Sequence, residues 1–189
     1  AMALFRAGEH KRMPWKNGGG ETVEIAVFPP HASVDDFDWR ISMATVASDG
    51  SFSIFPGIDR TLSILDGNGM GLEINGKAAV LLTRESQPLN FAADVPVEAR
   101  LVDGPITDLN VMTRRGRFSH SVERVTGRFC VSRNAPSDRV FVLAMGDAFA
   151  VSAHQSFALK ALDAISIDVA TDVQADDIVC YVIRLTPQG

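Results

Sequence analysis

Several features that would assign a protein of this size to a compartment or a chemistry are missing from the sequence. Among its 189 residues, no window approaches the run of about 18 apolar residues that a membrane-spanning helix needs, so we predict a soluble protein with no membrane partner. The N-terminus carries no basic segment followed by an apolar core, which is the pattern of a secretory signal. The expected location is therefore the cytoplasm.

Cysteine and histidine are sparse and unclustered. Cys130 and Cys180 lie in apolar, β-rich segments without a CxxC motif, so buried free thiols are expected. The histidines never pair at a spacing of two to four residues, and no carboxylate is placed to complete a metal triad, so we expect no metal site and no cofactor. A Ser-His-Asp or Cys-His arrangement leaves no local trace, although distant residues could still form one. The four histidines are His10, His31, His120 and His154.

The charge balance argues against a nucleic-acid partner. The sequence has 18 basic and 23 acidic residues, and its net charge of −5 repels a polyanion unless basic groups cluster. Arg114, Arg115 and Arg117 form the only tight basic cluster. No aromatic residues interleave with it to stack bases, so a solvated turn is the favoured interpretation.

Short runs of β-branched and aromatic residues alternate with turn signals throughout, and no window shows a sustained helical stripe. This pattern predicts an all-β protein with little helix. Asn75 and Gly76 give the strongest hairpin signal, because a two-residue type I′ turn needs positive φ at both positions. One helix is predicted, over 30–37. The predicted strands are 22–28, 39–47, 50–55, 60–66, 71–74, 77–82, 89–91, 97–103 and 107–113, followed by 127–132, 139–145, 148–153, 156–162, 164–168 and 179–185.

Two halves of the chain echo each other weakly. Residues 61–67 and 140–146 are each an apolar strand that runs into a glycine turn, and a second apolar strand follows in both cases. Many short strands with such a repeat favour a double-sheet jelly roll, or two jelly rolls in tandem.

The segment 14–22 reads Pro-Trp-Lys-Asn-Gly-Gly-Gly-Glu-Thr. Glycines lack a Cβ and tolerate positive φ, so their amides can converge on an anion, while Lys16 supplies a charge and Asn17 a donor and an acceptor. A ligand-binding loop is one interpretation. A glycine-rich turn before the apolar run 23–28 is the other, and these nine residues alone leave both open.

Polar residues also stand out within a predicted strand. In 39–47, alternation puts Arg40 and Ser42 on a face with small apolar residues, where a guanidinium aimed inward needs an anionic partner. An arginine on a solvated face is the alternative, and the strand alone favours it.

Two later segments have the same character. Phe52 and Phe55 are suited to wall an apolar pocket beside the opposite charges of residues 59–60, which as a plain surface pair need no pocket. In 107–113, alternation groups Asp108, Asn110 and Met112 on one side. Asparagine is unfavourable in mid-strand, so Asn110 is expected to hydrogen-bond something specific.

These segments, in this order, resemble the HutD/Ves family of small bicupins. The resemblance is carried by 14–22, 38–40, 55–60 and 108–112 followed by Arg114, and the second half matches by length and strand pattern only. It implies two tandem cupin jelly-roll barrels, residues 1–117 and 118–189, packed as one compact unit. The family is cytoplasmic and often encoded among histidine-utilisation enzymes.

The resemblance also implies a metal-free pocket in the first barrel for a small carboxylate or formyl-amino-acid ligand. An ordinary cupin carries His-x-His where this sequence reads Phe-Ser-Ile-Phe, at 52–55. Carried onto matching positions, the family's pocket consists of Lys16, Asn17, Thr22, Arg40, Ser42, Phe52, Phe55, Arg60, Asn110 and Met112.

Three functions follow as hypotheses. The first is a regulatory, metal-independent binding protein for a small anionic metabolite of histidine breakdown, of the urocanate or formylglutamate type. The second is a metal-free enzyme, an isomerase or hydrolase, with Lys16 or Asp59 as acid or base; whether there is any catalysis is uncertain, and binding alone is favoured. The third is a scaffold that presents its second half to a protein partner. A homodimer is left open.

Overall fold

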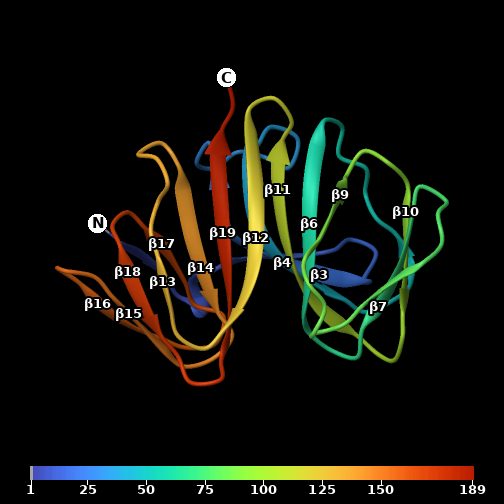
Figure 1. The fold of residues 1–189 in the computed structure, drawn as a ribbon. Helices are drawn as coiled ribbons and strands as arrows, with labels where there is room; N and C mark the ends of the chain where they lie inside the picture. The colour runs from blue at the N-terminus through green and yellow to red at the C-terminus, as the bar shows by residue number, and fades with distance from the viewer. Residues whose placement is uncertain (1) are drawn as a thin grey trace. The chain divides into compact units, whose positions relative to one another are not determined.

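The computed structural model describes residues 2–189, which form almost nothing but antiparallel strands (Figure 1). The one helical element among these residues is a 3-10 turn, η1 (Ala7–Glu9), so the all-β prediction is confirmed. The chain forms two compact units, one of residues 11–119 and the other of residues 2–10 with 120–189. No helix in this part of the chain is long and apolar enough to cross a membrane.

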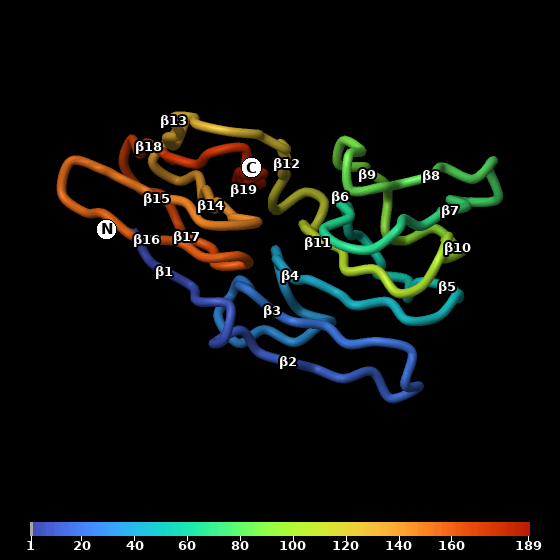
Figure 2. Tube along the Cα trace, turned by 90° about the horizontal axis from the view of Figure 1, so that it is seen from below, coloured from blue at the N-terminus to red at the C-terminus, as the bar shows by residue number. Residues whose placement is uncertain are grey.

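Residues 11–119, called the N-terminal unit below, form a large and a small sheet. The strand order is β2-β3-β4-β11-β6-β9 in the large sheet and β5-β10-β7-β8 in the small one. Figure 2 shows the small sheet beside β6 and β11, on the side away from β2. The bounds are β2 (Lys11–Pro14), β3 (Gly20–Phe28), β4 (Trp39–Val46), β5 (Gly50–Ser51), β6 (Ile58–Asp66), β7 (Met70–Ile74), β8 (Val80–Leu82), β9 (Leu89–Ala92), β10 (Val97–Leu101) and β11 (Ile106–Arg114).

An apolar core joins the two sheets of the N-terminal unit. Leu62 of β6, Met70 and Leu72 of β7 and Val97 of β10 belong to one buried cluster, and the first three have no exposed surface. Each such side chain contributes about 1.5–3 kcal/mol through burial. Because residues two apart along a strand share a face, the inward faces of β4, β6 and β11 carry, beside this core, a second set of side chains that also points into the unit.

Strand register aligns the polar residues of this second set. Met112 on β11 pairs with Arg40 on β4 and with Arg60 on β6, so the two arginines flank one methionine in a single row. In the next row on this face, Asn110 pairs with Ser42. The large sheet therefore presents a polar area to the interior of the unit.

The second unit is also built from two sheets. Their orders are β1-β17-β14-β19-β12 and β13-β18-β15-β16, and Val142, Ile165, Val173 and Cys180 are among its core residues. The bounds are β1 (Ala3–Phe5), β12 (Phe118–Thr126), β13 (Phe129–Val131), β14 (Arg139–Ala144), β15 (Ala148–Val151), β16 (Ser156–Leu159), β17 (Ala164–Ile167), β18 (Thr171–Gln174) and β19 (Val179–Pro187).

The division at residue 117 differs from the structure at the start of the chain. The domain boundary predicted from the sequence placed the first ten residues in the N-terminal barrel. In the structure, β1 instead pairs with β17 of the second unit. The following segment is held there too, because Asp163 accepts hydrogen bonds from Arg6 Nη1 at 2.7 Å and from the Ala7 amide at 2.8 Å.

Two local predictions were wrong. The helix over 30–37 is instead a pair of separate turns, closed by Ala32 N to Pro29 O at 3.0 Å and by Asp36 N to Ser33 O at 3.1 Å, because two successive prolines and short polar side chains favour turns over a helix. Cys130 is exposed rather than buried; Cys180 is buried as expected.

Candidate functional site

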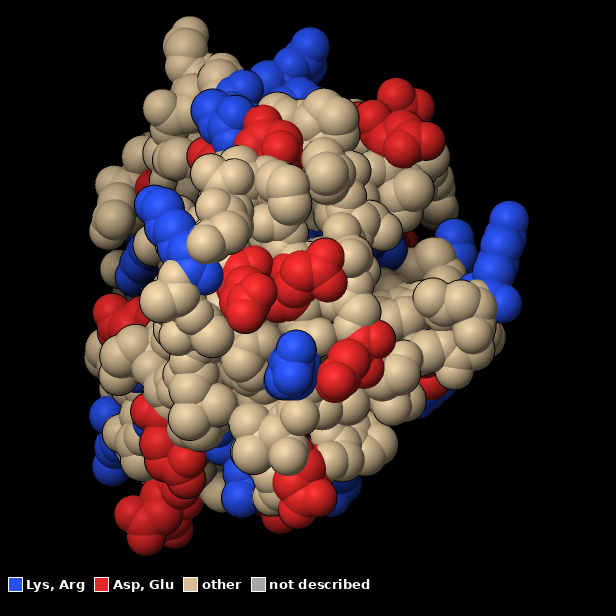
Figure 3. Space-filling view, turned by 90° about the vertical axis from the view of Figure 1, so that its right-hand side faces the viewer, with Lys and Arg blue, Asp and Glu red and all other residues tan. Residues whose placement is uncertain are grey.

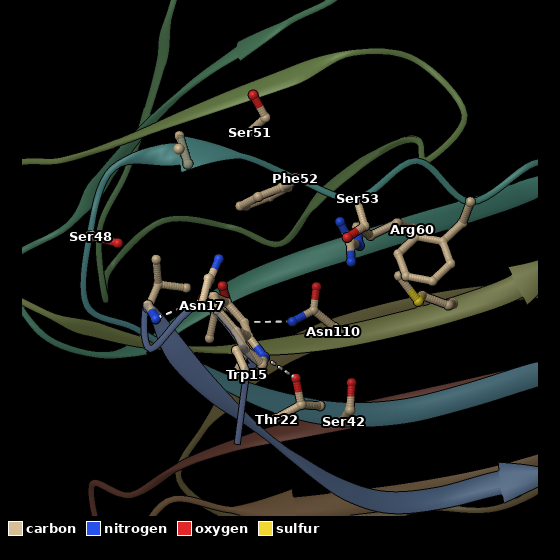
Figure 4. A pocket seen from close by; sticks show the side chains of 18 of the residues that line it. Trp15, Asn17, Thr22, Ser42, Ser48, Ser51, Phe52, Ser53, Arg60 and Asn110 are labelled. Carbon is tan, nitrogen blue, oxygen red and sulfur yellow. Dashed lines mark hydrogen bonds between the residues drawn. The ribbon is translucent and has the colours of Figure 1, made fainter. Parts of the chain in front are cut away.

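The N-terminal unit contains a cavity of about 470 Å³ that is partly open to solvent (Figure 4). Its volume is in the range of pockets that hold small metabolites. The ten residues carried over from the family's pocket all line this cavity: Lys16, Asn17, Thr22, Arg40, Ser42, Phe52, Phe55, Arg60, Asn110 and Met112. That they bind a ligand remains a prediction.

Two neighbouring strands supply the polar floor of the cavity. Arg40 and Ser42 come from β4, and Asp108 and Asn110 come from β11; all four have exposed fractions of 6% or less. The alternation in the sequence predicted these faces correctly. The alternative interpretation of Arg40, a solvated position, is wrong.

Glu24 on β3 is the anionic partner of Arg40. Arg40 Nε donates a hydrogen bond to Glu24 Oε1 at 3.0 Å, and both side chains are largely buried. A bulge in β3 between Glu24 and Ala26 shifts the register of the β3 and β4 ladder at this point. Part of the charge of Arg40 is therefore compensated within the protein.

Arg60 on β6 is the less satisfied of the two arginines. Its Cζ atom lies 5.2 Å from the centroid of the Phe52 ring and 5.4 Å from that of Phe55, so the guanidinium is held by two cation-π contacts. Its Nε atom is buried and has no hydrogen-bond partner among the described residues. Burial lowers the pKa of Arg60 to about 10, with Asp108 opposing the shift, so the side chain keeps its charge at neutral pH.

Asp108 is a buried carboxyl group on the cavity wall. It is 1% exposed, and its Oδ1 atom accepts a hydrogen bond from Asn110 Nδ2. Burial raises the pKa of Asp108 to about 7, although the charge of Arg60 and hydrogen bonds from Asn110 and the Ala44 amide act in the opposite direction. The group therefore changes charge near neutral pH. The amide oxygen of Asn110 is buried and has no partner in the described part of the chain.

The glycine-rich loop uses most of its amides to hold its own shape. Gly18 N donates to Trp15 O at 3.1 Å, and Gly19 N donates to Asn17 Oδ1 at 2.8 Å. The Trp15 indole donates to the Thr22 hydroxyl at 2.8 Å, which ties the loop to β3. The Gly18 and Gly19 amides are therefore occupied within the loop and do not point at a ligand, whereas the exposed Lys16 side chain stays available at the cavity.

Asp59 does not reach the cavity and does not pair with Arg60. It accepts a hydrogen bond from Arg115 Nη2 at 2.8 Å, while Arg115 Nη1 donates to Asp94 Oδ2 at 3.1 Å. Asp94 Oδ2 in turn accepts from the Gly57 amide at 3.1 Å. This network, called the Arg115 clamp below, fixes the turn that follows Phe55, so Arg115 is not a free charge on a solvated turn.

Within residues 2–189, no group of three or more His, Cys, Asp or Glu side chains is placed to hold a metal ion. His10, the most buried histidine, has its Nε2 atom 3.1 Å from the Leu162 carbonyl oxygen, in the second unit. The donor set of the cavity is instead composed of arginine, amide and hydroxyl groups, which suit an anionic organic ligand better than a cation.

Comparison with known proteins identifies the family. The HutD family model matches residues 7–180. This chain belongs to the HutD family. The HutD chain is 41% identical to protein Ves of Citrobacter koseri over 138 residues, which cover 70% of each protein.

Solved structures agree over the full length of this HutD chain. A conserved protein of unknown function from Pseudomonas aeruginosa matches with a TM-score of 0.86, and HutD from Pseudomonas fluorescens SBW25 matches with 0.83; both are 30% identical and aligned over 100% of each chain. A cupin 2 conserved barrel domain protein from Leptotrichia buccalis matches with 0.60 at 11% identity over 94% of this chain and 96% of that one, which shows the fold alone. The prediction of a cupin-like fold is confirmed.

Sequence reasoning left several cavity residues of this HutD protein unassigned. Asp108 shares its predicted strand face with Asn110 and Met112, and that pattern was signal enough to include it. Ser48 and Ser53 add hydroxyl groups to the wall, and Ser51 lines it while its hydroxyl donates to Glu98. All three lie in or beside the short strand β5, where no periodicity marks an inward face.

Proposed function

We propose that this HutD protein binds a small carboxylate metabolite in the cavity of its N-terminal unit, without a metal, as a regulatory protein linked to histidine utilisation. The ligand class is that of N-formyl amino acids and urocanate. The family name links the protein to histidine utilisation. One observation carries the ligand class: a charged guanidinium, Arg60, lines the cavity between two aromatic rings, and its buried Nε atom has no hydrogen-bond partner within residues 2–189.

A carboxylate satisfies such a group better than any neutral ligand. Hydrogen bonds between guanidinium and carboxylate are charge-assisted, and they strengthen where water is excluded. Arg40 is the weaker anchor, because its Nε atom is already bound to Glu24. Lys16 adds a second positive charge at the exposed loop.

The rest of the cavity fits the remainder of such a ligand. Figure 4 shows Phe52 on one side and the hydroxyl groups of Ser42 and Ser53 around the same space. Apolar walls with a few placed polar groups are typical of small-molecule sites. HutD from P. fluorescens has a structure described as a formate condition, and formate is the smallest carboxylate, which makes it a natural probe.

Calorimetric titration with urocanate, N-formylglutamate and formiminoglutamate tests the proposal. We expect at least one of them to bind more tightly than about millimolar, and Arg60→Met to weaken that binding at least about tenfold, since one charge-assisted contact contributes roughly 1.5–3 kcal/mol. Arg100→Met is the matched control, because Arg100 is an exposed residue of β10 that does not line the cavity. Failure of all three compounds to bind the wild-type protein would contradict the proposal.

A metal-free enzyme is the second candidate, and Asp108 is the observation that favours it. A carboxyl group whose pKa lies near 7 can both take up and release a proton at neutral pH, as a general acid or base must. Asp59, the acid or base named from the sequence, lies outside the cavity and is paired with Arg115. A time course by NMR that shows conversion of a bound compound, abolished in Asp108→Asn, would establish catalysis; unchanged compound after prolonged incubation would exclude it for that compound.

The face of the molecule shown in Figure 3 gives little support to a nucleic-acid partner. On the face shown in Figure 3, acidic and basic residues are interspersed. Mixed charge of this kind produces no sustained positive potential for a phosphate backbone. The small-molecule proposal therefore stands on the cavity alone.

A further inference from the structure

The floor of the cavity contains a polar pair that opposes the proposed ligand. Asn110 Nδ2 donates to Asp108 Oδ1, so the amide oxygen of Asn110 is the atom left for a ligand, and no described residue hydrogen-bonds it. Figure 4 shows this oxygen on the side of the asparagine that faces Arg60. A ligand carboxylate held by Arg60 would meet a second acceptor there, and two acceptors cannot hydrogen-bond without a proton between them.

Protonation of Asp108 reverses this polarity. A neutral carboxylic acid has an O–H group to donate, and Asn110 can accept it through Oδ1 after a half-turn of its amide. The Asn110 NH₂ group is then released toward the cavity. The floor changes from an acceptor to a donor, which is what a carboxylate requires.

The surrounding charges favour proton uptake when a carboxylate binds. Arg60 on β6 is the cation whose charge stabilises the ionised form of Asp108, and a ligand carboxylate on Arg60 neutralises that effect while adding a negative charge nearby. Arg40 on β4 also faces the cavity, but Glu24 on β3 already pairs with it. The loop groups Lys16 and Asp49 carry opposite charges, and Asp49 Oδ1 is engaged by the Leu101 amide at 2.8 Å.

We propose that Asp108 controls carboxylate binding: the ligand binds together with one proton, which Asp108 takes up, and the Asn110 amide reverses to donate to the ligand. Asp108 acts through Asn110 and is a positioning residue. The proposal rests on the proposed binding function and adds a requirement for a proton. Because burial already raises the pKa of Asp108 to about 7 without a ligand, the proton is available at neutral pH.

The test is calorimetry with formate and N-formylglutamate at about pH 6 and about pH 8, in buffers of different ionisation enthalpy. For the wild-type protein we expect about one proton taken up per ligand at the higher pH, and affinity that falls up to about tenfold per pH unit above about pH 7. In Asp108→Asn, the new amide can donate to Asn110 Oδ1 and hold it in the ligand-accepting orientation. This variant is expected to bind equally well at both pH values, without proton uptake.

Asp66→Asn is the control, since Asp66 is an exposed residue at the end of β6 that does not line the cavity, and it should behave as the wild type. Binding without proton uptake, or Asp108→Asn with the pH dependence of the wild type, would overturn the inference and leave the proposed function intact. Loss of binding in a folded Asp108→Asn protein would overturn it as well. If neither compound binds the wild-type protein at about pH 6, the inference falls, while the proposed function falls only if urocanate and formiminoglutamate also fail to bind.

Discussion

Gly20 lies against the carbonyl oxygen of Thr45 with no room for a side chain. A Cβ atom on Gly20 would overlap Thr45 O and would approach Trp15 Cζ3 to 2.8 Å. The third glycine of the run is thus required by close packing of backbone on backbone, whereas Gly18 has open space around it and a φ of +74°.

We expect substitution of these two glycines by alanine to reduce stability by different amounts. Gly20→Ala should destabilise the protein by about 2 kcal/mol or more, because a backbone oxygen cannot rotate away and the loop must shift. Gly18→Ala should cost about 1 kcal/mol from the left-handed conformation alone. Chemical denaturation measures both, with Gly8→Ala as a control that has open space and no positive φ. Equal effects at positions 18 and 20 would contradict this account.

The ion pair of Arg40 with Glu24 predicts opposite effects on stability and on binding. Glu24→Gln keeps the size of the side chain but leaves the largely buried Arg40 without its counter-charge, so we expect a loss of roughly 1–3 kcal/mol in the free energy of unfolding. The released guanidinium should in turn strengthen binding of a carboxylate several-fold. Denaturation and calorimetry with N-formylglutamate check the two effects. Weaker binding in the variant would show that Glu24 itself serves the ligand.

The pKa of Asp108 predicts how stability depends on pH. Burial raises the pKa of Asp108 in the folded state to about 7 from its ordinary value of 3.8, so the unfolded chain loses the proton first as the pH rises. The contribution of Asp108 to the free energy of unfolding is fully present below about pH 4 and is lost as the pH rises toward and through 7. Its size is on the order of a few kcal/mol. Asp108→Asn should remove this slope and be more stable than the wild type near pH 8. If the variant keeps the pH dependence of stability seen in the wild type, groups other than Asp108 cause that dependence.

The Arg115 clamp predicts an effect on binding larger than its effect on folding. Arg115 is about half exposed, so Arg115→Met should change stability little. It should nevertheless loosen the turn that carries Phe55 and weaken ligand binding several-fold, because Phe55 is one of the two rings against Arg60. Calorimetry compares this variant with Arg84→Met, an exposed arginine between β8 and β9 that does not line the cavity. If the two variants bind the ligand equally well, the Arg115 clamp has no effect on the ligand site.

The same clamp has a pH signature. Hydrogen bonds from Arg115 and from the Gly57 amide hold the pKa of Asp94 below its usual value. A carboxyl group whose pKa is lower in the folded state stabilises the protein at pH values above its pKa in the unfolded chain, near 4. This stabilisation is lost as the pH falls further. Thermal unfolding below that pH should therefore differ less between Arg115→Met and the wild type than it does at neutral pH.

The faces of the long strands were predictable from the sequence, and the short connections were not. Alternation placed Arg40 with Ser42 and Asn110 with Met112 on inward faces, because both strands are long enough for the period of two to be read. β12 and β18 were missed, since most residues of both strands are polar and several of them are exposed. The pairing of β1 with β17 joins residues more than 150 positions apart, and local pattern carries no information on such a pair.

The interaction partners of the charged groups could not be predicted from the sequence either. Residues 59 and 60 stand side by side, yet Asp59 pairs with Arg115 at the surface while Arg60 turns inward between two phenylalanines. Adjacent residues of a strand point to opposite faces, so their proximity in sequence separates them in space. Which arginine retains free donors depended on Glu24, whose position relative to Arg40 is set by a bulge.

The path of the first ten residues also decides how the molecule can be divided. Since β1 is an edge strand of the sheet formed by the far end of the chain, no single cut yields two fragments that each hold all their strands. A fragment that starts near residue 118 lacks that edge and exposes the backbone of β17, and the piece left behind carries an orphaned strand. To isolate the cavity-bearing half with its own strands alone, the polypeptide must be trimmed at both ends, to residues 11–119.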